Sequence, residues 1–205
     1  MAKFLIVSNR LPVTVKPGDD GFTYSKSIGG LATGLKNYHE QNDALWVGWP
    51  GVAKEILSET DQTKIAQKLE IDYKARPVFL SQDDIELYYE GFSNKTIWPL
   101  FHYFAEKTEH TIPMWEAYQA VNQRFLEALE PFIEPDSTIW VHDYQLMLLP
   151  GLIRDKYPSV KIGFFLHIPF PSFEIFRLLI WQKEILLGLL GSDLIGFHTY
   201  DYVRH

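Results

Sequence analysis

Three polar side chains directly follow two short apolar runs near the middle of the chain. His142 and Asp143 come after residues 138–141, and His167 comes after residues 162–166. A carboxylate and an imidazole at neighbouring strand ends could bind sugar hydroxyls or transfer a proton. A structural role fits equally well, with the histidines bonded to backbone carbonyls and Asp143 capping the next helix. The two histidines lack an evident third ligand, which argues against a metal site.

Two further features could bind an anion. Arg10 follows the apolar run 4–7, and a guanidinium there can hold a phosphate through paired hydrogen bonds. For a lone arginine, a surface ion pair with a carboxylate is the commoner role. Gly29 and Gly30 precede a helical pattern, so bare amides at a helix start could meet a phosphate. A glycine pair is more often a tight turn, and the spacing matches neither the dinucleotide fingerprint nor a Walker loop.

Aromatic side chains could line a polar pocket. Tyr88, Tyr89 and Trp98 lie close together in the sequence, and they would supply phenol donors and an indole wall. Aromatic residues at helical spacing more often belong to a core. The same alternative applies to Trp46 and Trp49, of which we expect Trp46 to be buried and Trp49 to lie at a strand exit.

The elements that must position these residues alternate between strand and helix. Residues 138–141 and 162–166 indicate buried strands, and residues 146–157 between them have helical spacing. A right-handed crossover would make the two strands parallel neighbours. Their polar ends would then meet at the carboxyl edge of a sheet, where open α/β folds bind ligands. We therefore expect the site at this edge.

The remaining patterns predict a doubly wound, Rossmann-like α/β fold with a mainly parallel sheet over residues 1–205. A hairpin is expected over residues 13–24, because turn residues separate two alternating runs. Further strands are expected at residues 4–7, 44–49, 77–80 and 194–197. Further helices are expected at residues 31–38, 54–71, 81–89, 114–132 and 172–190, and from Thr199 onward.

Composition narrows the class of protein. Of 205 residues, 46% are hydrophobic, 22% charged and 15% aromatic, which suits a core that also stacks rings on a polar ligand. The net charge of −7 and the lack of a basic run argue against nucleic acid as a partner. The absence of cysteine excludes disulfides and thiol chemistry. The first apolar run is too short for a secretory signal, and charges interrupt residues 173–190. We expect a cytoplasmic protein that does not insert into a membrane.

Motifs at residues 7–10, 29–31, 45–49, 88–94, 98–103, 140–144, 164–171 and 196–199 occur in one order along the chain. Together they resemble the trehalose-6-phosphate synthase family, retaining glycosyltransferases of family 20 with the two-domain GT-B architecture. The most specific motif is His-Ile-Pro-Phe-Pro at residues 167–171, after an aromatic strand. The resemblance implies that the chain is the amino-terminal, acceptor-side half of such an enzyme.

The resemblance also implies a reaction, in which glucose passes from a nucleotide sugar, usually UDP-glucose, to glucose 6-phosphate with retention. The product would be trehalose 6-phosphate. Carried over by motif, Arg10 and Tyr89 would bind the phosphate of the acceptor. Trp98 would shape that pocket, and Asp143 would hold hydroxyls of the acceptor.

On the donor side, the resemblance implies that Gly29 and Gly30 meet the diphosphate and that His167 contacts the transferred glucose. Asp143 and His167 would then lie at the reacting centre, and no cofactor or metal is expected. Retention without an evident nucleophile suits a same-face mechanism in which the leaving phosphate takes the proton of the acceptor. The two-carboxylate scheme of glycosidases would need a partner for Asp143 that the sequence does not offer.

The sequence departs from the family pattern at two points. Gln145 stands where many members have histidine, and we expect it to lie inside the following helix with little effect. The carboxy-terminal nucleotide-sugar domain is expected to be absent from this chain. We therefore expect low activity from the chain alone and an exposed apolar face where that domain would dock.

Two other functions remain open at this point. A related synthase could use glycerol 3-phosphate or a cyclitol phosphate as its acceptor. A catalytically silent relative could instead sense sugar phosphates. The residue types at the carried-over positions favour the enzyme, and a homo-oligomer is compatible with the sequence.

Overall fold

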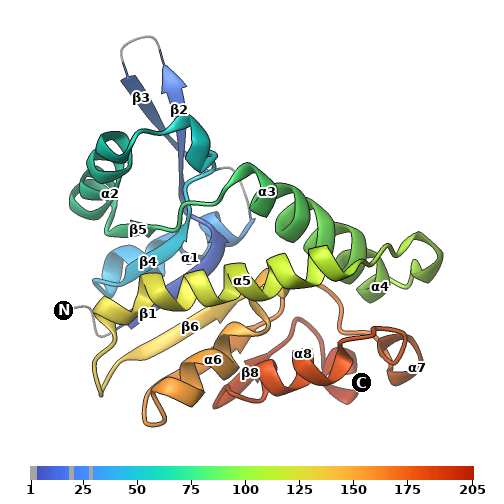
Figure 1. The fold of residues 1–205 in the computed structure, drawn as a ribbon. Helices are drawn as coiled ribbons and strands as arrows, with labels where there is room; N and C mark the ends of the chain where they lie inside the picture. The colour runs from blue at the N-terminus through green and yellow to red at the C-terminus, as the bar shows by residue number, and fades with distance from the viewer. Residues whose placement is uncertain (1–3, 19–20, 28–29) are drawn as a thin grey trace.

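The computed structural model describes residues 4–18, 21–27 and 30–205, with a six-stranded sheet at its centre (Figure 1). The strand order is β5-β4-β1-β6-β7-β8, and every neighbouring pair is parallel. This order confirms the predicted Rossmann-like, doubly wound sheet. The strands are β1 (Phe4–Arg10), β4 (Leu45–Trp49), β5 (Ala75–Pro77), β6 (Thr138–His142), β7 (Lys161–Phe165) and β8 (Leu194–Gly196).

Helices connect these strands on both faces of the sheet. The π-helical segment η2 continues α3, and short 3-10 turns complete several of the connections. The helical segments are α1 (Gly30–Gln41), α2 (Glu59–Tyr73), α3 (Gln82–Asp84), η2 (Ile85–Ile97), α4 (Trp98–Phe101), α5 (Ile112–Leu129), α6 (Leu149–Lys156), α7 (Phe173–Phe176), α8 (Gln182–Leu189) and α9 (Tyr200–Arg204).

Strand β1 separates two apolar cores because its successive side chains point to opposite faces. Leu5 and Val7 belong to the larger core, beneath α5, α6 and α8, which Figure 1 shows in front of the sheet. Ile6 belongs to the smaller core, to which α2 contributes Ile65 and Leu69. Coverage on both faces is typical of a parallel sheet and explains the continuous apolar runs of its strands.

The predicted hairpin is present as β2 (Val13–Gly18) and β3 (Gly21–Lys26), which pair antiparallel. Figure 1 shows it projecting beyond the carboxyl end of β1. Val13 and Val15 are buried in the smaller core. Thr14 and Lys16, which alternate with these valines, therefore face the opposite side, toward the carboxyl edge of the sheet.

Several predicted boundaries are wrong, and three of them have a clear local reason. The helix expected from residue 54 begins at Glu59, because Ser58 forms a capping box with Asp61. The strand expected at residues 77–80 is instead β5, which begins at Ala75, because α2 ends at residue 73 and the chain enters the sheet two residues later. The helix expected over residues 146–157 starts at Leu149, after a 3-10 turn over Tyr144–Leu146.

The long helix expected over residues 172–190 is broken into α7 and α8. Trp181 lies at the break, where its indole stacks on Trp115 with ring centroids 5.1 Å apart. The same indole packs against the ring of Phe92, 5.5 Å away. Tertiary packing of this aromatic side chain thus overrides the local helical pattern. Ser172 occupies the cap position of α7, but its side chain forms no capping hydrogen bond with the backbone of the helix.

Many of the exposed large apolar side chains lie in the last part of the chain. They belong to α7, α8, β8, α9 and the segments between them, and they are Phe173, Leu178, Ile180, Leu186, Leu187, Leu190, Leu194, Tyr200 and Val203. Among the described residues, no helix is both long enough and apolar enough to cross a membrane.

The close approach of α6 and α8 generates a stability prediction. A Cβ atom at Gly188 would lie 2.3 Å from the carbonyl oxygen of Met147, so we expect Gly188→Ala to lower the free energy of unfolding by about 1–3 kcal/mol. Gly34 in α1 has no atom within 4 Å of such a Cβ, and Gly34→Ala should leave stability unchanged or raise it by about 0.5–1 kcal/mol. Urea unfolding measures both changes. Equal stabilities of the two variants would contradict this account of the packing.

Candidate active site

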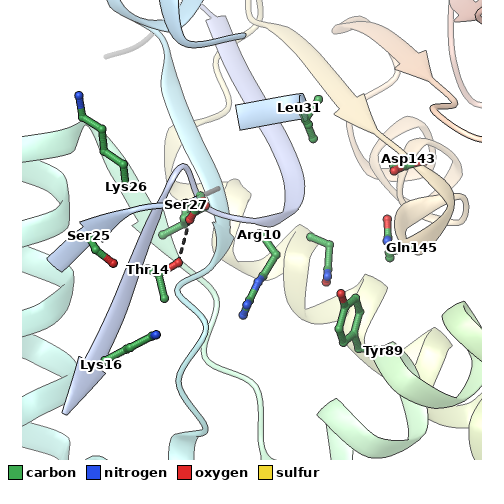
Figure 2. Close-up of a pocket in the computed structure, with 12 residues that line it drawn as sticks. Arg10, Thr14, Lys16, Ser25, Lys26, Ser27, Leu31, Tyr89, Asp143 and Gln145 are labelled. Carbon is green, nitrogen blue, oxygen red and sulfur yellow. Dashed lines mark hydrogen bonds between the residues drawn. The ribbon is translucent and has the colours of Figure 1, made fainter. Parts of the chain in front are cut away.

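A pocket of about 500 Å³ opens at the carboxyl end of β1 (Figure 2). It lies where the chain leaves β1 toward β4 on one side and returns in β6 on the other, the usual ligand site of a doubly wound sheet. The hairpin forms one wall, and residues after β6 form another. The lining residues are Asn9, Arg10, Leu11, Thr14, Lys16, Ser25, Lys26, Ser27, Leu31, Tyr89, Asp143 and Gln145.

Arg10 contributes a cation to the pocket. Its guanidinium carbon lies 4.3 Å from the ring centroid of Trp49, and partial burial lowers the pKa of the guanidinium. Arginine nevertheless remains charged at neutral pH. Within the described part of the chain, no carboxylate forms an ion pair with Arg10. The alternative role of Arg10, a surface ion pair with a carboxylate, is therefore wrong as far as the described residues go. The N–H donors of Arg10 are available to an anion.

Tyr89 and Lys16 lie near the Arg10 guanidinium. The Tyr89 ring packs edge-on against Trp49, with centroids 6.0 Å apart. Figure 2 shows the ammonium of Lys16 directed toward the guanidinium of Arg10, whereas the ammonium of Lys26 points away. One end of the pocket thus presents two cations and a phenol.

The segment that carries Tyr89 is anchored through buried phenol groups. Tyr88 donates its hydroxyl to Asn9 Oδ1 at 3.0 Å, and Tyr144 donates its hydroxyl to Asn94 Oδ1 at 2.8 Å. Burial raises the pKa of both phenols, so both remain donors at neutral pH. A π-helical segment such as η2 is frequently found at functional sites.

Asp143 occupies the other end of the pocket on a strained backbone. Its φ of 77° and ψ of 168° lie in a region that glycine almost alone adopts. Its Oδ1 accepts hydrogen bonds from the backbone N–H groups of Tyr144 and His167, at 3.0 and 3.1 Å. Burial nevertheless raises the pKa of Asp143 to about 6. The carboxylate is therefore largely ionised at pH 7 and can accept hydrogen bonds from hydroxyls.

His142 and His167 lie side by side at the ends of β6 and β7, as predicted. His142 Nδ1 is 3.1 Å from His167 Nε2. Burial lowers the pKa of His142 to about 3 and that of His167 to about 4, so both rings are neutral at pH 7. His167 does not line the pocket. Its backbone N–H instead donates to the carboxylate of Asp143, which does line the pocket.

Three predicted binding residues have different outcomes. Trp98 does not line this pocket: the residue is 40% exposed, and its indole stacks on the ring of His102 one helical turn later, with centroids 4.0 Å apart. Gly30 is the first residue of α1, beside the lining residue Leu31. Gly29 lies outside the described residues.

Sequence reasoning missed residues on both walls of the pocket. Gln145 is not inside a helix as predicted; it lies in the 3-10 turn after Asp143, where it is buried and lines the pocket. On the hairpin, Thr14 and Lys16 line the pocket. The apolar Val13 and Val15 could have indicated Thr14 and Lys16, because residues that alternate with buried positions of a strand face the opposite side.

Comparison with known proteins identifies the family. The model of glycosyltransferase family 20 matches residues 2–205. The chain belongs to glycosyltransferase family 20. A curated relative, alpha,alpha-trehalose-phosphate synthase (UDP-forming) 1 of Aspergillus niger, is 46% identical over 209 residues, covering 100% of this chain and 40% of the relative.

Solved family 20 structures confirm that the fold matches the amino-terminal Rossmann-like half of a GT-B enzyme. The alpha,alpha-trehalose-phosphate synthase of Burkholderia vietnamiensis superposes with a TM-score of 0.82 at 32% identity, covering 100% of this chain and 41% of that chain. The Burkholderia xenovorans enzyme in complex with glucose-6-phosphate superposes with a TM-score of 0.78 at 30% identity, covering 98% of this chain and 41% of that chain. This family 20 chain thus spans about two fifths of the length of these relatives.

The strained backbone at Asp143 generates a second prediction. Asp143→Gly and Asp143→Ala both remove the carboxylate and its hydrogen bonds, but only glycine relieves the strain. We expect Asp143→Gly to be the more stable variant by about 1–2 kcal/mol, because about 1–3 kcal/mol of strain exceeds the extra entropy of glycine in the unfolded chain. Thermal and urea unfolding of the pair measure this difference. An alanine variant as stable as the glycine variant would show that the backbone is unstrained.

Proposed function

We propose that this chain forms the acceptor side of a family 20 enzyme that transfers glucose from UDP-glucose to glucose 6-phosphate with retention, giving trehalose 6-phosphate. One observation carries the proposal: the pocket has cations at one end that pair with no carboxylate of the described residues, and a largely ionised carboxylate at the other. A sugar phosphate has the complementary arrangement, with a dianion at one end and hydroxyl groups at the other.

The cationic end would bind the phosphate of the acceptor. Arg10 offers paired donors of fixed geometry, and its stacking on Trp49 restricts the orientation of the guanidinium. Tyr89 would add a phenol donor, and Lys16 would add a second positive charge from the hairpin. With no competing carboxylate paired to Arg10 or Lys16 among the described residues, both charges are available to the ligand.

The opposite end would hold the sugar. Asp143 would accept hydrogen bonds from acceptor hydroxyls, and Gln145 would add an amide beside it. Within the described residues, Asp143 is the only carboxylate that lines the pocket. We therefore assign it to orientation of the acceptor and not to nucleophilic attack, and we propose that the leaving phosphate of the donor takes the acceptor proton.

The donor would approach from the side of α1 and His167. We propose that Gly29 and Gly30 meet its diphosphate near the start of α1 and that His167 contacts the transferred glucose. A neutral imidazole suits this contact, since it can exchange hydrogen bonds with a hydroxyl without introducing a charge.

The remaining part of such an enzyme would supply the other wall of the cleft. Because the chain spans about two fifths of its relatives, we propose that the remaining donor-binding residues lie in the part it does not match. That part would cover the exposed apolar side chains of α7, α8, β8 and α9. The isolated chain should accordingly form little trehalose 6-phosphate. A cytoplasmic location and a homo-oligomer stay predictions.

Calorimetric titration with glucose 6-phosphate tests the proposal. We expect weak binding that Arg10→Ala weakens at least tenfold, because hydrogen bonds to charged groups contribute about 1.5–3 kcal/mol. Lys16→Ala should weaken binding less. Lys161→Ala is the matched control, because Lys161 is exposed at the start of β7, the opposite edge of the sheet, and should leave the affinity unchanged.

The outcomes separate the alternatives. Glucose 6-phosphate should bind more tightly than glycerol 3-phosphate, because it presents more hydroxyls to Asp143. The reverse order would favour a different acceptor. Absence of binding, or an equal effect of the Arg10 and Lys161 substitutions, would contradict a preformed acceptor pocket.

A further inference from the structure

We propose that His142 is a positioning residue that donates its Nδ1–H to Nε2 of His167 and so holds His167 in the tautomer with its proton on Nδ1. The two nitrogens are 3.1 Å apart, and the ring planes are inclined by 37°. Strand pairing fixes this geometry, because His142 is the last residue of β6 and lies opposite Phe165 in β7. His167 follows two residues later.

The bond contains a single proton because both rings are neutral. Burial holds the pKa of each imidazole well below 6.5, at about 3 for His142 and about 4 for His167. No carboxylate of the described residues bonds to either ring. Asp143, the nearest candidate, bonds the backbone N–H of His167 and not its imidazole. A neutral pair can form this hydrogen bond in only two ways. Either His142 donates from Nδ1 to Nε2 of His167, or His167 donates from Nε2 to Nδ1 of His142.

The burial of His142 distinguishes the two arrangements. The residue is 0% exposed, and its Nε2 has no hydrogen-bond partner among the described residues. If His142 accepted at Nδ1, its own proton would occupy Nε2 as a buried donor without an acceptor. If His142 donates from Nδ1, Nε2 is only a bare acceptor. Orphaned buried N–H groups are rarer in proteins than under-satisfied acceptors, so the second arrangement is favoured.

The other neighbours pack against the two rings without competing for this bond. The Trp140 ring lies 4.5 Å from the His142 ring, and the Phe165 ring lies 4.6 Å from the His167 ring. The exposed His198 ring lies 5.5 Å from His167, edge-on to it. Nδ1 of His167 is therefore the nitrogen left to meet a ligand.

This arrangement gives His167 a defined chemical role, which rests on the proposed function. With Nε2 occupied by His142, the imidazole presents a neutral N–H donor at Nδ1. It would donate a hydrogen bond to a hydroxyl oxygen of the bound sugar and would not remove a proton from it. The role of His142 is thus to select a donor instead of a base at the reacting centre.

Long-range 1H–15N correlation of the histidine rings at pH 7 tests this inference without any substrate. We expect His167 to show a protonated Nδ1 and a bare Nε2, with the resonances assigned through His167→Gln. A protonated Nε2 on His167 would overturn the inference. Because this readout requires no ligand, failure of sugar-phosphate binding would leave it unaffected and would count only against the proposed function.

Variants of His142 provide a second readout. His142→Phe fills the space without a donor and should shift His167 toward a mixture of tautomers. His142→Gln retains a donor and should preserve more of the Nδ1–H form. His198→Phe is the control, since His198 packs near His167 but forms no hydrogen bond with it, and it should leave the tautomer unchanged. An unchanged His167 spectrum in His142→Phe would contradict the inference.

Discussion

The hydrogen bonds that join the ends of β6 and β7 at Asp143 are the constraint on which the site depends. The backbone N–H of Asp143 donates to Phe165 O at 2.8 Å, and the carboxylate accepts from the N–H of His167 at 3.1 Å. These two bonds turn the chain out of β6 with a positive φ at Asp143. The same turn directs Gln145 into the pocket and leaves His142 beside His167.

Helix α5 supports this turn from beneath. The buried hydroxyl of Tyr118 donates to Tyr144 O at 2.7 Å and accepts from the N–H of Met147 at 3.1 Å. Asn122 donates to Gln145 O at 3.1 Å. These bonds satisfy the carbonyls of Tyr144 and Gln145 and the N–H of Met147, and they help to offset the strain at Asp143. The site is rigid on this side, and the hairpin wall supplies the charges on the other.

The sequence predicts the sheet well because its strands are buried on both faces and form continuous apolar runs. The polar residues at the ends of β6 and β7 could likewise be placed, since parallel strands end at one edge. Helix breaks were harder to predict, because Trp181 leaves its helix for a tertiary contact with Trp115. Gln145 was misplaced because Asp143 adopts a backbone conformation that residue type does not indicate. Lys16 was missed because its role depends on how the hairpin is placed relative to the end of β1, which the alternation of the hairpin residues does not show.

A crystal structure of the chain with glucose 6-phosphate tests the central claim most directly, namely that the acceptor binds between the hairpin and the turn after β6. The account predicts the phosphate against Arg10 and Lys16 and sugar hydroxyls against Asp143. A second cleft of about 380 Å³, lined in part by Lys54 and Arg124, lies elsewhere on the surface, and Arg124 is ion-paired there with Asp84. A sugar phosphate bound there, with the pocket at Arg10 empty, would contradict the account.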